Sequence, residues 1–316
     1  MNVRLNLSKK KTRLSPPIRL SAQAIIAIVL LWLKSVINRE YSMIFFNKKT
    51  LILLFLAICF KTESKVNESV VRQYKNQLEA EDRALMNDFL DSFGITLYEW
   101  HEFKKTCEKD FQRSEQKVKH DAQARCGKPI SDRLKVMIAS VINKANIPRS
   151  IEIIRDNSPD FADMGTLRSL MLVDETHFNK IHPQEDQAIA KIWHEVMHLY
   201  HDDSFIQFCL KDLKNKAISS SSYVNWFNLG WFGDFIKKVR ERFNLNKWEI
   251  THNKWRLFRE RRADMLSGLI SPQIANAWVT IWKNYMINYV DCSDGDHPLA
   301  AERLAYMTKL RDEMVA

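Results

Sequence analysis

Apolar side chains recur every three or four residues over most of the chain, and this spacing predicts amphipathic helices. Residues 131–146 contain one such stripe. Residues 67–126 contain another, which Phe93-Gly94 interrupts, so this region is expected to form two or three helices. Only 7 of the 316 residues are glycine, which favours a helical over an all-β protein.

Two short stretches have a different pattern and predict strands. Residues 150–156 (SIEIIRD) and 167–174 (LRSLMLVD) are rich in β-branched and large apolar side chains. The turn-forming residues between them are Asn157, Ser158, Pro159, Asp163 and Gly165. We therefore expect an α+β fold that is mostly helical, with a small sheet packed on the helix that follows.

That following helix is expected to begin near Pro183, which suits a first helical position. Glu185 and Asp186 come next, where carboxylates favour the positive end of the helix dipole. The motif HEVMH (194–198) lies on this helix. Its apolar stripe consists of Ile189, Ile192, Trp193, Val196, Met197 and Tyr200.

His194 and His198 are four residues apart, so on a helix they share one face. Two histidines at this spacing can bind one zinc ion, and Glu195 between them can serve as general base. Chance alone would produce such a motif in a chain of this composition about once in a hundred. An ordinary polar turn is therefore the alternative, but the amphipathic helix around the motif favours the metal site.

A later acidic segment supplies candidates for the rest of a metal site. In FRERRADML (258–266), Glu260 and Asp264 are four residues apart and share a face. A carboxylate is the usual third protein ligand beside two histidines. A second acid one turn away can accept the ring N–H of a ligating histidine. The alternative is a solvated face of ion pairs with Arg256, Arg259, Arg261 and Arg262.

Positive charge is concentrated at the start of the chain, whose formal net charge is +10. Residues 1–66 contain 12 of the 48 basic and 2 of the 38 acidic side chains, so the rest contains 36 of each. The remainder has no net charge and no basic face for nucleic acid, and we expect no nucleic-acid partner.

Residues 1–66 have the features of a leader or targeting segment. The apolar runs 24–33 and 51–60 are each shorter than the roughly 20 residues that span a bilayer. From Met43, basic residues, an apolar run and polar residues follow one another as in a signal peptide. This order predicts export to a bacterial cell envelope, either to the periplasm or to a membrane-anchored position. A pair of membrane-associated helices that stay attached is the alternative.

Export would permit disulfides. Cys107 and Cys126 are candidates for a bridge between two helices, and free buried thiols are the alternative. No C-x-x-C pair occurs, so a thiolate zinc site is not expected. The cysteines are Cys59, Cys107, Cys126, Cys209 and Cys292.

The three segments HEVMH (194–198), ERRADM (260–265) and HPLAAERL (297–304) together resemble the HtpX- and CAAX-prenyl-protease-type zinc metallopeptidases. The resemblance extends over roughly residues 130–310. It implies a zincin-like metallopeptidase domain whose small sheet pairs its edge strand with substrate. The expected organisation is then a leader (1–66), a helical N-terminal region (67–126) and the metallopeptidase domain (127–316).

The resemblance also implies a role for each matching residue. His194, His198 and Glu260 would bind one zinc ion per chain, with Glu195 as general base. Asp264 would accept a hydrogen bond from a ligating histidine. The remaining two residues are His297, which would donate to the oxyanion, and Arg303, which would brace the site.

Two departures from the family pattern affect the interpretation. The family often has a histidine five residues past the motif, whereas His201 comes three past it, so we expect an accessory role for His201. The chain also has no long apolar segment after residue 60, which favours a soluble or lipid-anchored member. The expected activity is cleavage of unfolded or damaged envelope polypeptides. The alternatives are an envelope binding or holdase module on this fold, and a helical scaffold without metal.

Overall fold

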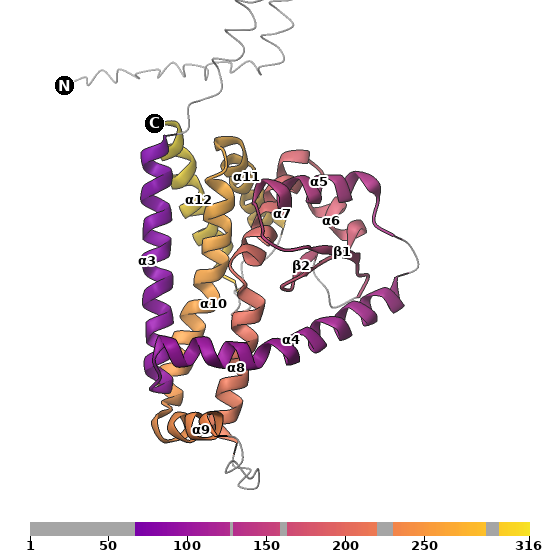
Figure 1. Ribbon diagram of the computed structural model, residues 1–316. Coiled ribbons are helices and arrows are strands. Elements are labelled where there is room, and N and C mark those ends of the chain that lie inside the picture. Colours follow the sequence, from indigo (N-terminus) through magenta and orange to yellow (C-terminus); the bar gives the residue numbers. More distant parts are fainter. Residues whose placement is uncertain (1–66, 127–128, 159–162, 220–229, 289–296) are drawn as a thin grey trace, which may run out of the picture. The chain divides into compact units, whose positions relative to one another are not determined.

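Helices make up most of the computed structural model (Figure 1). The residues that it describes are 67–126, 129–158, 163–219, 230–288 and 297–316. They belong to one unit, Ser64–Ala316, of the two into which the chain divides. The helices are α3 (Glu68–Phe93), α4 (Leu97–Arg125), α5 (Asp132–Lys144), α6 (Glu175–Ile181), α7 (Glu185–Tyr200), α8 (Asp203–Ile218), α9 (Trp231–Arg242), α10 (Leu245–Gly268), α11 (Pro272–Asn288) and α12 (Ala300–Val315).

The sheet has three strands in the order β1-β3-β2. Strand β1 (Glu152–Arg155) pairs in parallel with β3 (Leu170–Val173), and β2 (Met164–Thr166) pairs antiparallel with β3. All four residues of β3 are buried, as expected for a central strand. The predicted mostly helical α+β class with a small sheet is confirmed.

The sequence predicted β1 and β3 but missed β2. Three residues are too few to show the alternation of a strand, and Gly165 at its centre is typical of a turn. The residue pairs Met164–Val173 and Thr166–Met171 form because β3 offers its second edge to the chain that precedes it. Tertiary pairing therefore overrides the local preference here.

Capping residues fix several helix ends. Gly94 has the left-handed φ of 65° after α3, which explains the break expected at Phe93-Gly94. Thr96 and Glu99 then form a capping box that begins α4. Helix α7 begins at Glu185 rather than at Pro183, which lies just before it.

Two apolar cores meet at α7 and α10. The larger core lies among the helices α3, α4 and α8 to α12. The smaller core lies between the sheet and α5, α6 and α7. Ile189 on α7 and Leu266 on α10 pack against both cores. The two helices that contain the predicted metal ligands are therefore held from both sides.

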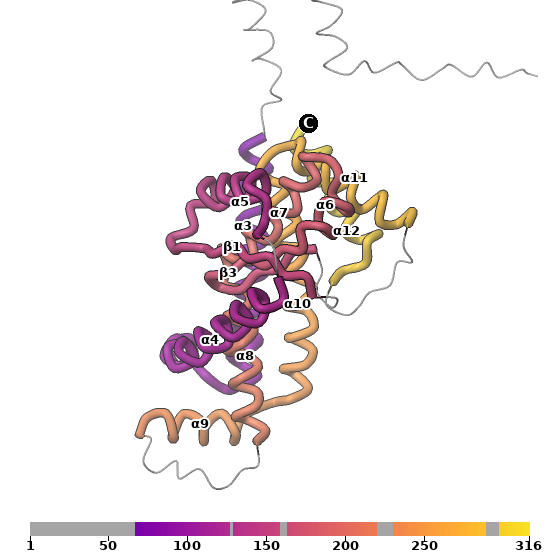
Figure 2. Tube along the Cα trace, turned by 90° about the vertical axis from the view of Figure 1, so that its right-hand side faces the viewer, coloured from indigo at the N-terminus to yellow at the C-terminus, as the bar shows by residue number. Residues whose placement is uncertain are grey.

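Residues 67–126 pack directly on the rest of this unit. Helix α3 lies along α10, and Figures 1 and 2 both show α10 beside α3 and α7. Helix α4 contacts α8, β1 and β3. Residues 67–126 and the described residues after them therefore lie in one compact unit.

Of the two alternatives left open for Cys107 and Cys126, the structure shows free thiols rather than a bridge. Cys107 lies within α4 and Cys126 directly follows its last residue, Arg125. Nineteen residues of α-helix put their Cα atoms roughly 28 Å apart, far beyond the reach of a disulfide. Instead, the Cys126 thiol donates to the carbonyl oxygen of Arg155, and the Cys107 thiol donates to Asp212.

The leader, the signal-peptide interpretation from Met43, and the cysteines Cys59 and Cys292 all lie outside the described residues. Within the described part of the chain, no helix is long and apolar enough to cross a membrane.

Candidate metal centre

Helices α7 and α10 bring the three predicted ligands together. His194 Nε2 lies 3.1 Å from His198 Nε2 and 3.3 Å from Glu260 Oε2. His198 Nε2 lies 3.6 Å from Glu260 Oε1. A tetrahedral ion with bonds of about 2.0–2.1 Å separates its ligand atoms by about 3.3–3.4 Å. The three separations are close to this value, so these three residues could hold a metal ion.

Each histidine is oriented through its other ring nitrogen. His194 Nδ1 lies 2.8 Å from Asp264 Oδ1, and His198 Nδ1 lies 2.7 Å from Asp203 Oδ2. A neutral imidazole whose Nδ1 donates to a carboxylate keeps its lone pair on Nε2. Both Nε2 lone pairs then face one another at 3.1 Å, and a cation or a proton between them removes their repulsion.

Asp264 is fully buried and receives several hydrogen bonds. Arg303 donates to both of its oxygens at 2.7 Å, and the hydroxyl of Tyr306 donates to Oδ2. Burial raises the pKa of Asp264, but Arg303 and His194 outweigh it and hold the pKa well below its usual 3.8. Asp264 is therefore ionised at physiological pH and accepts a hydrogen bond from His194. Arg303, predicted to brace the site, lies behind Asp264.

Asp203, the matching acid behind His198, was not predicted. It is the first residue of α8, directly after Asp202, whose φ of 56° turns the chain sharply at the end of the motif helix. Burial raises the pKa of Asp203, but Arg262 and His198 outweigh it and lower it to about 2. Arg262, on α10, donates to Asp203 and pairs with Asp82 of α3 at 2.8 Å. The only sequence signal was the run of acids in HDD (201–203).

The cluster attracts positive charge before any metal binds. Burial lowers the pKa of His198, but the carboxylates of Glu260 and Asp203 outweigh it and raise that pKa to about 10. Burial likewise disfavours the Glu260 anion, but the two histidines hold its pKa well below 4.5. A divalent cation bound here therefore displaces a proton.

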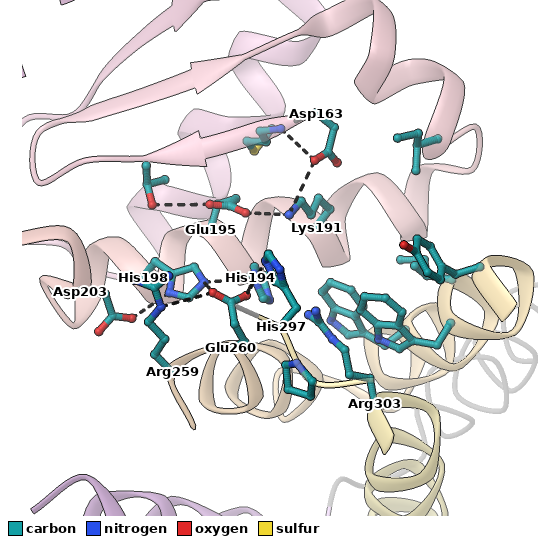
Figure 3. A pocket seen from close by; sticks show the side chains of 18 of the residues that line it. Asp163, Lys191, His194, Glu195, His198, Asp203, Arg259, Glu260, His297 and Arg303 are labelled. Carbon is teal, nitrogen blue, oxygen red and sulfur yellow. Dashed lines mark hydrogen bonds and ion pairs between the residues drawn. The ribbon is translucent and has the colours of Figure 1, made fainter. Parts of the chain in front are cut away.

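Glu195 lies beside the cluster but is held by other partners. Figure 3 shows Glu195 and Glu260 on opposite sides of the histidine pair. Lys191, one turn earlier on α7, donates to Glu195 Oε1 at 2.7 Å, and Thr166 of β2 lies 3.5 Å from Oε2. Lys191 also lies 3.8 Å from Asp163. The roles of Lys191 and Asp163 were not predicted, because nothing in their local sequence distinguishes them from surface charges.

The structure also places His297 near the cluster and His201 away from it. His297 Nε2 lies 3.7 Å from Glu260 Oε2, and its side chain is half exposed. His201 is the residue after α7 and does not join the candidate ligands. Burial and the nearby Arg262 lower the pKa of His201 to about 4, so it is neutral at physiological pH.

The three candidate ligands, together with Glu195 and His297, line one cavity of about 560 Å³. Its walls include these candidate ligands, the edge strand β2 and one face of α11 (Figure 3). A volume of this size is typical of sites that bind a small molecule or a few residues of a polypeptide. No protein family, curated protein or solved structure matches this chain.

Proposed function

We propose that this protein is a zinc-dependent endopeptidase that cleaves unfolded or damaged polypeptides. The observation that carries the proposal is the ligand cluster itself. The ring nitrogens of His194 and His198 lie 3.1 Å apart and each lies within 3.6 Å of a Glu260 carboxylate oxygen, and a buried carboxylate holds each histidine. The resemblance to the HtpX- and CAAX-prenyl-protease-type metallopeptidases supports the same activity.

Three protein ligands leave one position of a tetrahedral zinc ion open, which is the arrangement of catalytic sites. A bound zinc ion would supply Lewis acidity to a water molecule and to a peptide carbonyl. In the proposed reaction, Glu195 takes a proton from the attacking water and passes it to the leaving amine. His297 lies at the same cavity and would donate a hydrogen bond to the developing oxyanion.

The cavity wall also favours an extended substrate. Strand β2 is an edge strand, and Met164, Thr166 and Leu167 line the cavity. An unfolded segment can add to such an edge through main-chain hydrogen bonds, which do not depend on side-chain identity. An unfolded polypeptide, rather than a folded partner, is therefore the proposed substrate.

The test measures zinc content and cleavage of an unfolded protein such as reduced casein on the same samples. Glu195→Gln should keep one zinc per chain and lose roughly 10²–10⁴-fold in rate. His194→Ala should lose both zinc and activity. Glu185→Gln, on the exposed first turn of the same helix, is the matched control and should retain both.

Cleavage by Glu195→Gln at the wild-type rate would refute the hydrolase assignment. Zinc-loaded wild type that binds unfolded protein without cleaving it would instead identify a binding module. If the protein contained no zinc after incubation with the metal, the remaining interpretation would be a helical scaffold without a metal site.

A further inference from the structure

Aromatic side chains of α11 form one wall of the cavity. Trp278, Ile281, Trp282 and Tyr285 all line it, at the three- and four-residue spacing of one helix face. The indoles of Trp278 and Trp282 are stacked, with centroids 5.7 Å apart and planes 9° apart. Tyr285 meets Trp282 edge-on at 5.9 Å. The wall is therefore a continuous aromatic surface.

The inner end of this aromatic surface contacts the candidate metal ligands. The ring of Trp278 lies 5.5 Å from that of His194, and its Nε1 donates to Ser267 Oγ at 2.6 Å. The Arg303 guanidinium lies 3.9 Å from the centre of the Trp282 ring, and Arg303 is itself bound to Asp264. The aromatic wall and the ligand His194 are therefore held by the same buried acid.

The outer part of the wall is open to a ligand. Trp282 and Ile281 are half-buried, and Tyr285 is 39% exposed. Ile181, which lines the same cavity from α6, is 40% exposed. The Trp282 Nε1 is buried and has no hydrogen-bond partner among the described residues.

We propose that Trp278, Ile281, Trp282 and Tyr285 form a subsite for one large apolar side chain of the polypeptide, next to the bond that is cleaved. This inference rests on the proposed endopeptidase function and specifies its substrate. Aromatic rings pack well against stacked indoles, and burial of apolar surface drives the binding. The Arg303 guanidinium beside Trp282 is paired with Asp264, so it is already neutralised when a substrate side chain enters.

A set of peptides tests this subsite. They are identical except for Phe, Leu, Ala or Asp at the residue on either side of the cleaved bond, which mass spectrometry identifies. We expect kcat/KM for one of the two positions to fall at least about 100-fold from Phe or Leu to Ala, and further to Asp. Trp282→Ala should reduce that preference to less than about tenfold while the zinc content stays at the wild-type value.

A binding measurement separates this inference from the proposed function. Zinc-loaded Glu195→Gln protein is titrated with the fluorescent Phe and Ala peptides, and anisotropy gives their Kd values. We expect the Phe peptide to bind at least about tenfold more tightly, and Tyr285→Ala in the same background to weaken that binding. Tyr98→Ala, an exposed tyrosine on α4, is the control and should change neither Kd.

Each outcome has a definite meaning. Equal cleavage and equal binding of the Phe and Ala peptides overturns the subsite and leaves the endopeptidase standing. A Phe preference in binding without any cleavage by wild type refutes the endopeptidase and supports the subsite. If Trp282→Ala fails to fold, as judged by circular dichroism, Tyr285→Ala decides the question, because its side chain lies at the exposed end of the wall.

Discussion

Arg262→Met should both destabilise the protein and weaken its metal binding. The Arg262 side chain is 4% exposed and lies between two acids, Asp203 on α8 and Asp82 on α3. Asp203 is 3% exposed and orients His198, whereas Asp82 is 36% exposed. Methionine approximates the volume of arginine but leaves Asp203 without its cation. Asp82 is exposed enough to be solvated by water, so most of the loss in stability comes from the buried, unpaired charge of Asp203.

The expected size follows from the burial of this pair. Removing one partner of a buried ion pair costs about 3–5 kcal/mol. For a protein of this size, each kcal/mol lowers Tm by about 2–4 °C, so Tm should fall by roughly 6–20 °C. Because Asp203 holds His198, zinc affinity should also fall about 10–100-fold.

The neighbouring residue provides a matched control. Arg261 also pairs with an acid of α3, Glu81, but both side chains are more than a third exposed. Arg261→Met should therefore cost no more than about 1 kcal/mol and leave zinc affinity unchanged. Thermal unfolding and competition with a chelator measure the two effects. Equal losses in Arg261→Met and Arg262→Met would refute the reasoning, because burial would then make no difference.

Three further predictions concern individual residues. Asp264→Asn should lower zinc affinity about 10–100-fold, measured by competition with a chelator; unchanged affinity would contradict the role assigned to this acid. Lys191→Met should reduce the cleavage rate at full zinc content, because Glu195 loses its partner at 2.7 Å; a wild-type rate would show that the ion pair is irrelevant. Burial and nearby cations lower the pKa of His252 to about 4. Its unfolded form takes up a proton near pH 6.5, so stability should fall from about pH 6.5 towards pH 4. His252→Phe should make urea-unfolding midpoints less sensitive to pH in that window, and an unchanged slope would exclude His252 as the cause.

The sequence predicted those features that a local pattern encodes. Helix periodicity located α5 and α7 to within a few residues, and the HExxH spacing put His194 and His198 on one face. Glu260 and Asp264 were found because they share a helix face, although that pattern alone equally fits a solvated face.

Residues that act through tertiary contacts could not be predicted in this way. Asp203 reaches His198 only because the chain reverses at Asp202, and a single acidic residue gives no sign of such a turn. In the sequence Lys191 resembles a surface charge, and only the folded structure places it beside Asp163 and Glu195. The Cys107–Cys126 bridge was a candidate for a related reason, since the sequence does not show that one helix, α4, continues from Leu97 to Arg125 and separates the two cysteines.

The two-residue link between α7 and α8 also limits how this protein can change in length. His201 and Asp202 alone connect the ligand helix to the helix that returns Asp203 to His198. One inserted residue would lengthen this link and displace Asp203, the first residue of α8, from its present position relative to α7. Asp203 would then lose its place beside His198, and Arg262 would lose its buried partner. An insertion between α7 and α8 should therefore disrupt metal binding, even though insertions in other surface connections are tolerated.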